Sequence, residues 1–355
     1  MSALIRLASV DALRGLTVAA MLLVNDPGDW GHVYSPLEHA EWNGCTPTDL
    51  VFPFFLFIVG VSIALSLGPR IDARSDAAAL RHAVMVRALR IVALGLLLHV
   101  AAYWMMDTRA FRPFGVLQRI GICFGVVGLL AIDAKPRVQW LLVGAILLGY
   151  WALMAWGGPL TKEGNLASRV DTALLGRFAY EFDAVTGRGH EPEGLLSTLP
   201  AIATTLLGLR AGDWLRRGRT RLLWQVAGVA LLLGALWSMF FPLNKQLWTS
   251  SYVLWSGGVA MLTLWIAHRL VDLHRWPAIG RSFGVNAIAA YAGAWLMVCV
   301  LVGLHWMQPL YASGFAWMTP YVGPYVPSLA FAIAFVALWW MVVSVLDRRK
   351  IYFKV

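Results

Sequence analysis

Apolar stretches of about twenty residues recur along the chain, separated by short segments that hold most of the charged residues. A helix of about twenty apolar residues is long enough to cross the hydrocarbon core of a bilayer. The pattern therefore predicts an all-α, polytopic transmembrane helical bundle of about ten spans, with no internal repeat and no large soluble domain. The expected spans are 10–28, 48–68, 84–106, 113–132, 138–156, 194–214, 222–241, 248–268, 279–304 and 325–346.

The overall composition supports this class. Hydrophobic residues make up 59% of the chain and charged residues only 14%, whereas soluble proteins carry roughly 25% charged residues. We therefore expect a single transmembrane domain over residues 1–355 with the lipid bilayer as its surroundings. Arg6 precedes an apolar run, but Asp11 and Arg14 interrupt it and no small-residue cleavage site follows, so we expect an uncleaved first span.

The basic residues are distributed unevenly between the two sides of the expected bundle. Alternate connecting segments, together with both termini, hold 20 lysines and arginines, and the remaining connections hold 7. Because cytoplasmic segments of membrane proteins are enriched in Lys and Arg, both termini are expected in the cytoplasm. The net charge of +10 then reflects membrane topology, and nucleic acid is not expected as a partner.

A polar stretch stands immediately before the second span. It contains Glu38, His39, Trp42, Asn43 and Asp49. Polar groups at a membrane boundary cost desolvation energy unless they are paired or used. We expect residues 26–48 to form an outer loop that carries an active site. The alternative is a solvated loop in which Asp49 only caps the following helix.

A second long outer connection covers residues 157–193 and is either a lid over the site or a solvated connector.

Other polar residues interrupt or flank the apolar spans. Asp11 and Arg14 are three residues apart and share one helix face, so they form a local ion pair or bind an anionic cofactor. An arginine inside a span must face a partner or a cavity. The remaining polar residues of this kind are Gln118, Arg119, Asn244, Lys245 and Asn286.

Several segments together resemble a known family. They are SVDALRGLTVAAMLLVN, HAEWNGCTPTDLVFPFFLFIVGVSIALS, GVLQRIGICF, LLSTLPAIATTLLGLRAG, FPLNKQLWTSSYVL and GVNAIAAYAG. The chain resembles the heparan-α-glucosaminide N-acetyltransferase family of transmembrane acyltransferases. The resemblance implies that acetyl-CoA binds from the cytoplasmic side and that acetyl is delivered to an amino sugar on the far side. It places the family's essential histidine on His39 and its active-site asparagine on Asn25.

Acetyl transfer to an amine requires a base, donors for the developing oxyanion, and fixed positions for the reacting atoms. His39 is the expected base, with Asp49 or Glu38 orienting its ring. Asn25 and Asn43 are candidate donors. The candidates for acceptor binding are Trp42, which could instead anchor the chain at the membrane interface, together with Glu38, Asn43, Asn244 and Lys245.

The CoA nucleotide is expected at the cytoplasmic end, where guanidinium groups can bind its phosphates. The candidate cofactor residues are Asp11, Arg14, Gln118, Arg119, Arg281 and Asn286. For Arg281 the alternative is a purely topological charge. The three cysteines, Cys45, Cys123 and Cys299, are far apart in the chain, and neither a disulfide nor a metal site is expected.

Two other functions fit the same pattern. Polar residues on both faces of ten spans would also serve an amino-sugar or other small-solute permease, and a glycan-binding scaffold would need no chemistry. For the acetyltransferase, the expected acceptor is glucosamine or a short amino-sugar glycan, and the expected location is a bacterial inner membrane. A homodimer is compatible with the sequence.

Overall fold

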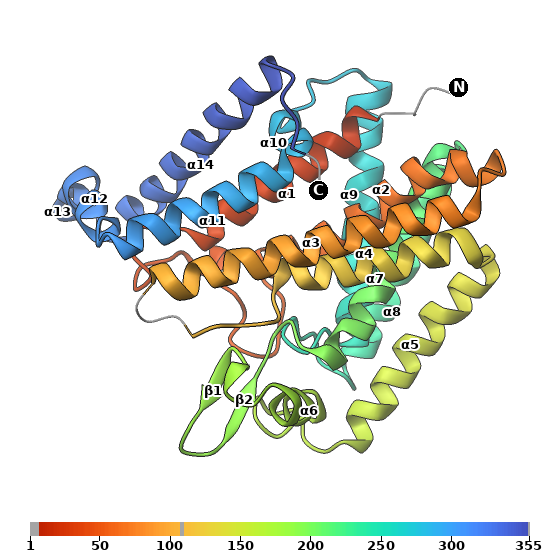
Figure 1. The fold of residues 1–355 in the computed structure, drawn as a ribbon, viewed down its shortest axis with the longest axis horizontal. Coiled ribbons are helices and arrows are strands. Elements are labelled where there is room, and N and C mark those ends of the chain that lie inside the picture. Colours follow the sequence, from red (N-terminus) through yellow and green to blue (C-terminus); the bar gives the residue numbers. More distant parts are fainter. Residues whose placement is uncertain (1–6, 107–109, 354–355) are drawn as a thin grey trace.

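The computed structural model describes residues 7–106 and 110–353, which form a helical bundle (Figure 1). Arg6, Arg109 and Lys354, which enter the charge distribution, lie outside the described residues. Within the described ranges, nine helices are long and apolar enough to cross a membrane. They are α1 (Ala8–Asn25), α2 (Val51–Asp72, extended at its start by η2, Thr48–Leu50), α3 (Ala77–Met105), α4 (Val116–Asp133), α5 (Pro136–Trp156), α7 (Leu195–Arg216), α8 (Arg221–Ser238), α9 (Ser250–Ala267, continued by η4, His268–Leu273) and α14 (Tyr325–Arg348).

These nine helices confirm nine of the ten expected spans, but the expected span 279–304 is not one continuous helix. It consists of α10 (Arg281–Val285) and α11 (Ala287–Gly303), with a break at Asn286. After α11 the chain turns by 91° into α12 (Met307–Gly314), and α11 and α12 together give the tenth candidate span. The break allows α10 to pack on α1 while α11 packs on α3. Beyond α12 lie η5 (Ala316–Met318) and α13 (Thr319–Val322).

Glycines allow the central helices to approach closely. A Cβ atom on Gly60 of α2 would lie 2.0 Å from the carbonyl oxygen of Thr205 on α7, and one on Gly208 would lie 2.0 Å from the carbonyl oxygen of Phe57. Small residues permit such backbone contacts between membrane helices. Helices α2 and α7 therefore form the tightly packed centre of the bundle, where eighteen of the twenty-two residues of α7 are buried.

Helices α1 and α10 meet in the same way. A Cβ on Gly15 would lie 1.8 Å from the carbonyl oxygen of Gly280, and one on Gly284 would lie 1.8 Å from the carbonyl oxygen of Asp11. This contact fixes the first turns of α1, and with them Asp11 and Arg14, against the polar start of the broken span.

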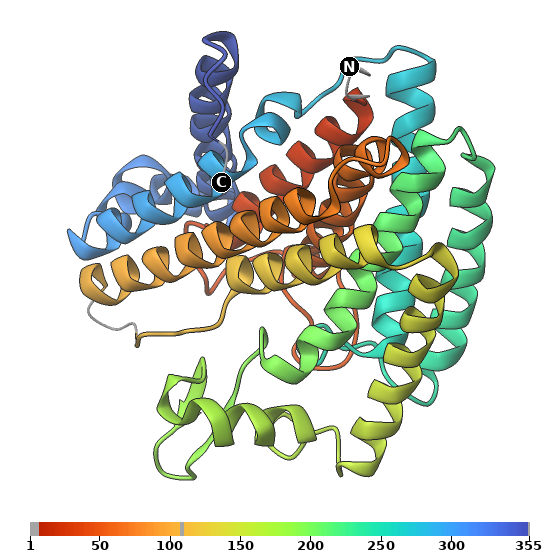
Figure 2. The same cartoon turned by 45° about the vertical axis from the view of Figure 1, so that its right-hand side comes forward.

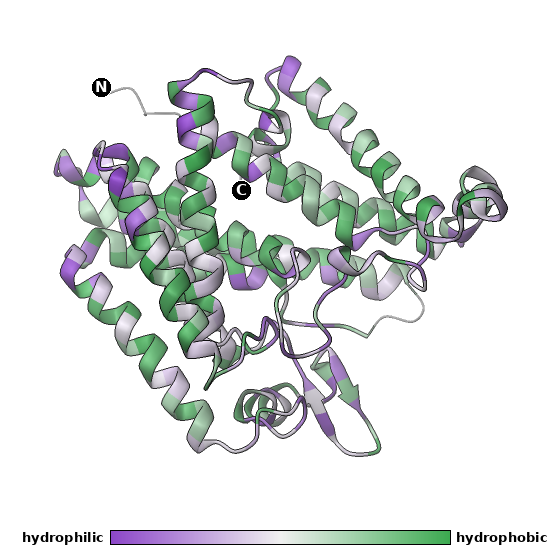
Figure 3. Ribbon diagram, turned by 180° about the vertical axis from the view of Figure 1, so that it is seen from behind, coloured by the Kyte–Doolittle hydropathy of each residue, from purple (hydrophilic) through white to green (hydrophobic). Residues whose placement is uncertain are grey.

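The connecting segments separate onto two faces. On one face, ion pairs join the ends of neighbouring helices: Arg216 to Asp72 at 2.6 Å and Arg81 to Asp133 at 2.6 Å. Figures 1 and 2 show the turns after α2, α4 and α7 grouped on this side. In Figure 3, hydrophilic colouring concentrates at helix ends and loops, while hydrophobic colouring follows the helices.

The opposite face carries the long connections. Residues 26–50 include η1 (Ser35–Leu37), and residues 157–193 include α6 (Leu166–Leu175), η3 (Gly176–Phe178) and an antiparallel pair, β1 (Glu181–Asp183) and β2 (Arg188–His190). The two loops contact each other where the Trp42 indole donates to the carbonyl oxygen of Leu160 at 2.7 Å. The loop between α8 and α9 joins them, because the Gly44 amide donates to the carbonyl of Leu243 at 2.7 Å.

Candidate active site

His39 and Asp49 form a hydrogen-bonded pair at the outer loop. The Nδ1 atom of His39 lies 2.7 Å from Oδ1 of Asp49, whose side chain is 1% exposed whereas that of His39 is 46% exposed. The other carboxylate oxygen accepts from the backbone amides of Ala40, at 3.1 Å, and Thr46, at 2.9 Å. An ionised carboxylate only accepts hydrogen bonds, so Nδ1 carries the proton and Nε2 keeps its lone pair. A base held by a buried carboxylate is the arrangement expected for proton transfer.

The amino group of Lys245 contacts the imidazole of His39. Its Nζ atom lies 3.0 Å from Nε2 and 3.2 Å from Nδ1 of His39. Burial lowers the pKa of Lys245, although the charges of Glu193 and Asp49 oppose that shift. Sequence reasoning assigned Lys245 to the acceptor, and the structure brings it into direct contact with the expected base.

Asn244 and Asn43 shape the loop that presents Lys245. The Asn244 side chain is fully buried; its Oδ1 accepts from the Leu247 amide at 2.8 Å and its Nδ2 donates to Oδ1 of Asn43 at 3.4 Å. Trp42 anchors residues 157–165 through Leu160. Glu38 is exposed, and the hydrogen bonds given for it among the described residues are made by its backbone: its amide donates to the carbonyl of Ser35 and its carbonyl accepts from the Thr46 hydroxyl. None of these four expected acceptor residues lies in the cavity wall described next.

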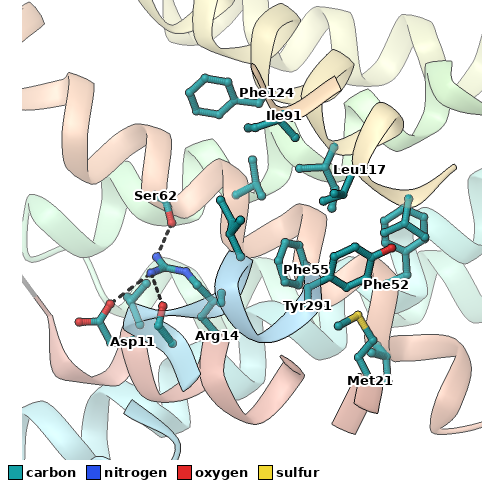
Figure 4. A pocket seen from close by; sticks show the side chains of 18 of the residues that line it. Asp11, Arg14, Met21, Phe52, Phe55, Ser62, Ile91, Leu117, Phe124 and Tyr291 are labelled. Carbon is teal, nitrogen blue, oxygen red and sulfur yellow. Dashed lines mark hydrogen bonds and ion pairs between the residues drawn. The ribbon is translucent and has the colours of Figure 1, made fainter. Parts of the chain in front are cut away.

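A cavity of about 530 Å³ connects this site with the opposite half of the bundle. Its outer end is lined by Asn25, His39, Thr48, Glu193 and Lys245, and its other end by Leu7, Asp11, Arg14, Ser62, Arg87 and Phe353. Apolar side chains form the wall between them, among them Phe55, Leu117 and Tyr291 (Figure 4). Arg14 and Asn25 are eleven residues apart on α1, which corresponds to about 16 Å along the helix axis.

Among the described residues, Asp11, Ser62 and Gly284 hold Arg14 at the far end of the cavity. Arg14 donates to Oγ of Ser62 at 2.7 Å, to the carbonyl of Gly284 at 3.2 Å and to Asp11 at 3.3 Å (Figure 4). Arg87 of α3 lines the same end, with its guanidinium 5.1 Å from the ring of Phe124. The sequence interpretation treated Arg87 only as a topological charge, because an arginine near a span end is typical of cytoplasmic segments.

Four expected cofactor residues are not in the cavity wall. Arg119 is fully buried near the outer end of α4, where it donates to the Ser197 hydroxyl at 2.5 Å. Arg281 pairs with Asp347 at 2.8 Å. The side chains of Gln118 and Asn286 are 2% and 0% exposed, and their amide groups have no hydrogen-bond partner among the described residues. The structure therefore brings only Asp11 and Arg14 of that set to the cavity.

Glu193 is a cavity residue that the sequence did not single out. It stands at the end of the outer segment 157–193 and pairs with Arg112, which also donates to Glu191 at 2.9 Å. Burial alone would raise the pKa of Glu193, but the positive charges of Arg112, Arg119 and Lys245 hold it below its usual value. Its only sequence signal is an acidic pair immediately before an apolar span.

The outer segment 157–193 is folded around buried polar contacts. Asn165 caps α6 by accepting from the Ser168 amide at 2.8 Å, and the Ser168 hydroxyl lies 2.8 Å from Nδ1 of His190. The His190 ring packs edge-on against Trp42, with ring centroids 5.3 Å apart. Because Glu193 at its end lines the cavity, this segment is placed to cover the outer mouth, and its role as a lid stays a prediction.

Acid is expected to loosen this segment through His190. Burial lowers the pKa of His190 to about 4, below its ordinary value of 6.5. The folded segment therefore loses stability as pH falls from about 6.5 towards 4, by up to about 3 kcal/mol, because the unfolded chain binds the proton more readily. The protection factors for amide hydrogen exchange of residues 157–193, which correct for the pH dependence of intrinsic exchange, should fall across this window, and His190→Gln should flatten the response.

Asp171 titrates nearby with the opposite sign, since burial raises its pKa to about 6. Asp171 is present in both wild type and His190→Gln, so the difference between their pH responses reports the contribution of His190 alone. His32→Gln, in the other outer loop, provides a control that should leave the response unchanged. An identical pH response in wild type and His190→Gln would contradict the assignment.

The fold and the cavity define a class of protein: a polytopic membrane bundle whose enclosed site extends from arginines near one face to a histidine–aspartate pair near the other. Residues 6–237 match the family described as heparan-alpha-glucosaminide N-acetyltransferase, catalytic, and the chain belongs to this family. The resemblance inferred from the motifs is thereby confirmed.

Relatives with that description occur in mammals. The heparan-alpha-glucosaminide N-acetyltransferases of Homo sapiens and Mus musculus are 28% and 27% identical to this chain over an alignment of 413 positions, gaps included, which covers 99% of the chain. The chain spans 60% of the length of these relatives.

Proposed function

We propose that the protein is an acetyl-CoA-dependent N-acetyltransferase that takes acetyl from cytoplasmic acetyl-CoA and delivers it to the amine of an amino sugar at the outer face. The observation that carries the proposal is the single cavity that joins Arg14 and Arg87 to His39. Membership of the family and the names of the relatives support the same reaction.

The residues of the cavity suit acetyl-CoA. Two guanidinium groups, of Arg14 and Arg87, lie at the end where the phosphates would bind, since guanidinium matches phosphate geometry. The apolar wall suits the extended arm, and when bound the cofactor supplies a thioester carbonyl to the outer end. The bias of basic residues supports a cytoplasmic location for the arginine end.

His39 acts on the acceptor amine. Its Nε2 removes a proton from the amine, while Asp49 keeps the ring oriented and stabilises the resulting imidazolium. Asn25, which lines the same end of the cavity, is the proposed donor to the developing oxyanion. The acceptor amine reaches Nε2 next to the amino group of Lys245, which lies 3.0 Å from the same nitrogen.

The proposed acceptor is glucosamine or a short amino-sugar glycan, bound between the outer loop 26–48 and the segment 157–193. We further propose a bacterial inner membrane with both termini in the cytoplasm as the location. A homodimer stays a prediction from the sequence alone.

Product analysis tests the activity. The purified protein should convert glucosamine to N-acetylglucosamine carrying the label of isotopically labelled acetyl-CoA, detected by mass spectrometry. The alternative, a permease, predicts glucosamine counterflow in liposomes without acetyl-CoA. Counterflow without any labelled product would replace the proposed function by transport.

Arg14 is expected to contribute to cofactor binding. Arg14→Ala should weaken acetyl-CoA binding roughly tenfold or more, since a charge-assisted hydrogen bond contributes about 1.5–3 kcal/mol. Arg281→Ala is the matched control, because Arg281 also lies near this face but pairs with Asp347 outside the cavity wall. Titration calorimetry that shows equal acetyl-CoA affinity in Arg14→Ala and wild type would remove Arg14 from the site.

A further inference from the structure

The amino group of Lys245 lies against His39, the proposed base for the acceptor amine. Its Nζ lies 3.0 Å from Nε2 and 3.2 Å from Nδ1 of His39, within hydrogen-bond reach of the base. His39 is in turn held by Asp49 at 2.7 Å. Lys245 also lines the cavity that leads to Arg14. A primary amine, a base and a path to the opposite half of the bundle therefore meet at one place.

The backbone that carries this amine is fixed. Asn244 is fully buried, and its backbone amide donates to the Thr249 hydroxyl at 3.1 Å. The amide of Trp248 donates to the carbonyl of Lys245 itself at 3.1 Å. Gly44 joins the same loop to the outer loop that carries His39. The folded loop therefore fixes the backbone of Lys245 close to His39.

We propose that Lys245 is a self-acetylation site, which the enzyme modifies when acetyl-CoA is bound and no amino sugar is present. This inference rests on the proposed function, because it uses the same acetyl donor and the same base. The modification removes the positive charge of Lys245 and places an amide beside Nε2, where the acceptor amine has to bind.

The chemistry balances without a further reagent. His39 removes one proton from the Lys245 amine as the nitrogen lone pair attacks the thioester carbonyl. The new N–C bond forms, the C–S bond breaks, and the sulfur leaves with the electron pair and receives the proton from His39. The products are acetyl-lysine and CoA. The amide does not return its acetyl group, so the modified protein is a dead end.

The charges around Lys245 decide how readily it reacts. Burial favours the neutral, nucleophilic amine, whereas nearby carboxylates favour the ammonium form. The titratable groups that influence it, besides the adjacent His39, are Glu193, Asp49, Arg119 and Cys45. Removal of the main opposing carboxylate, in Glu193→Gln, should therefore increase the rate of self-acetylation.

The other lysines of the chain provide an internal control. The full-length purified protein is incubated with labelled acetyl-CoA, with and without excess glucosamine, and each lysine is then mapped by peptide mass spectrometry. Labelling should concentrate on Lys245 over the exposed Lys135 and Lys350, and glucosamine should suppress it. His39→Ala should slow the labelling of Lys245 about a hundredfold or more, the usual contribution of a general base, without changing the exposed lysines.

A second variant links the modification to activity. Pre-incubation with acetyl-CoA should inactivate the wild type in proportion to the acetylated fraction, and Lys245→Arg should show no such time-dependent loss. Label at Lys245 that matches the exposed lysines, or that persists in His39→Ala, would overturn the inference. If glucosamine is acetylated and Lys245 is not, the inference fails while the proposed function stands; if neither is acetylated, the proposed function itself fails.

Discussion

Replacement of His39 by alanine is expected to lower the rate of amino-sugar acetylation on the order of a hundredfold or more, the usual scale for loss of a general base. The fold should change little, because the side chain is 46% exposed and buries little apolar area. Steady-state turnover at saturating acetyl-CoA and glucosamine, together with the thermal unfolding midpoint in detergent, measures both effects. His39→Asn should be about as inactive, since it preserves polarity but not basicity.

The matched control is His32→Ala. His32 lies in the same outer loop and also pairs with an aspartate, Asp29, at 2.8 Å, but it does not line the cavity. Its loss should leave turnover close to wild type. A folded His39→Ala protein that acetylates glucosamine as fast as His32→Ala would remove His39 as the base and leave Asp49 or Glu38 to be tested.

Replacement of Asp49 by asparagine is expected to reduce turnover on the order of a hundredfold or more, comparable with the loss of His39 itself, because the catalytic tautomer of the histidine is lost. An asparagine amide can donate to Nδ1, which places the imidazole proton on Nε2 and removes the base. Asp49 also accepts from the backbone amides of Ala40 and Thr46, so a loss of about 1–3 kcal/mol in stability should accompany the change.

Asp29→Asn is the corresponding control, because Asp29 accepts from the Gly31 amide and from His32 without contact to the cavity. Both variants should fold, and only Asp49→Asn should lose turnover. The pH dependence of turnover separates positioning from stability: loss of structure alone would leave the shape of the profile unchanged. Wild-type turnover in a folded Asp49→Asn protein would show that the His39–Asp49 hydrogen bond has no part in the reaction.

Much of the fold follows from the sequence because membrane helices depend on local composition. Twenty apolar residues in succession define a span wherever they occur, and nine spans were predicted in this way. The break at Asn286 could not be predicted from local composition, because it accompanies the close contact of Gly284 in α10 with the backbone of Asp11. That contact joins residues more than 270 positions apart, and no local pattern describes it.

The site was predictable in part for the same reason. His39 and Asp49 are ten residues apart in one polar stretch, so their pairing could be expected. The approach of Lys245 to His39, 206 residues away, depends on the packing of two loops and cannot be read from either alone. The expected topology already argued against Arg119 as a residue that binds the cofactor. The span 113–132 is expected to begin on the outer face, so Arg119 lies about two turns from the outer end and far from a cytoplasmic nucleotide.

The most direct test of the account is the sidedness of the reaction in sealed liposomes that contain the purified protein. Acetyl-CoA is supplied on one side of the membrane and glucosamine either on the opposite side or on the same side. Because the cavity is proposed to take the cofactor at the Arg14 end and the sugar at the His39 end, N-acetylglucosamine should form only when the two substrates are on opposite sides, whatever the orientation of the protein. If N-acetylglucosamine forms when both substrates are on the same side and does not form when they are on opposite sides, the proposed transfer across the membrane is wrong.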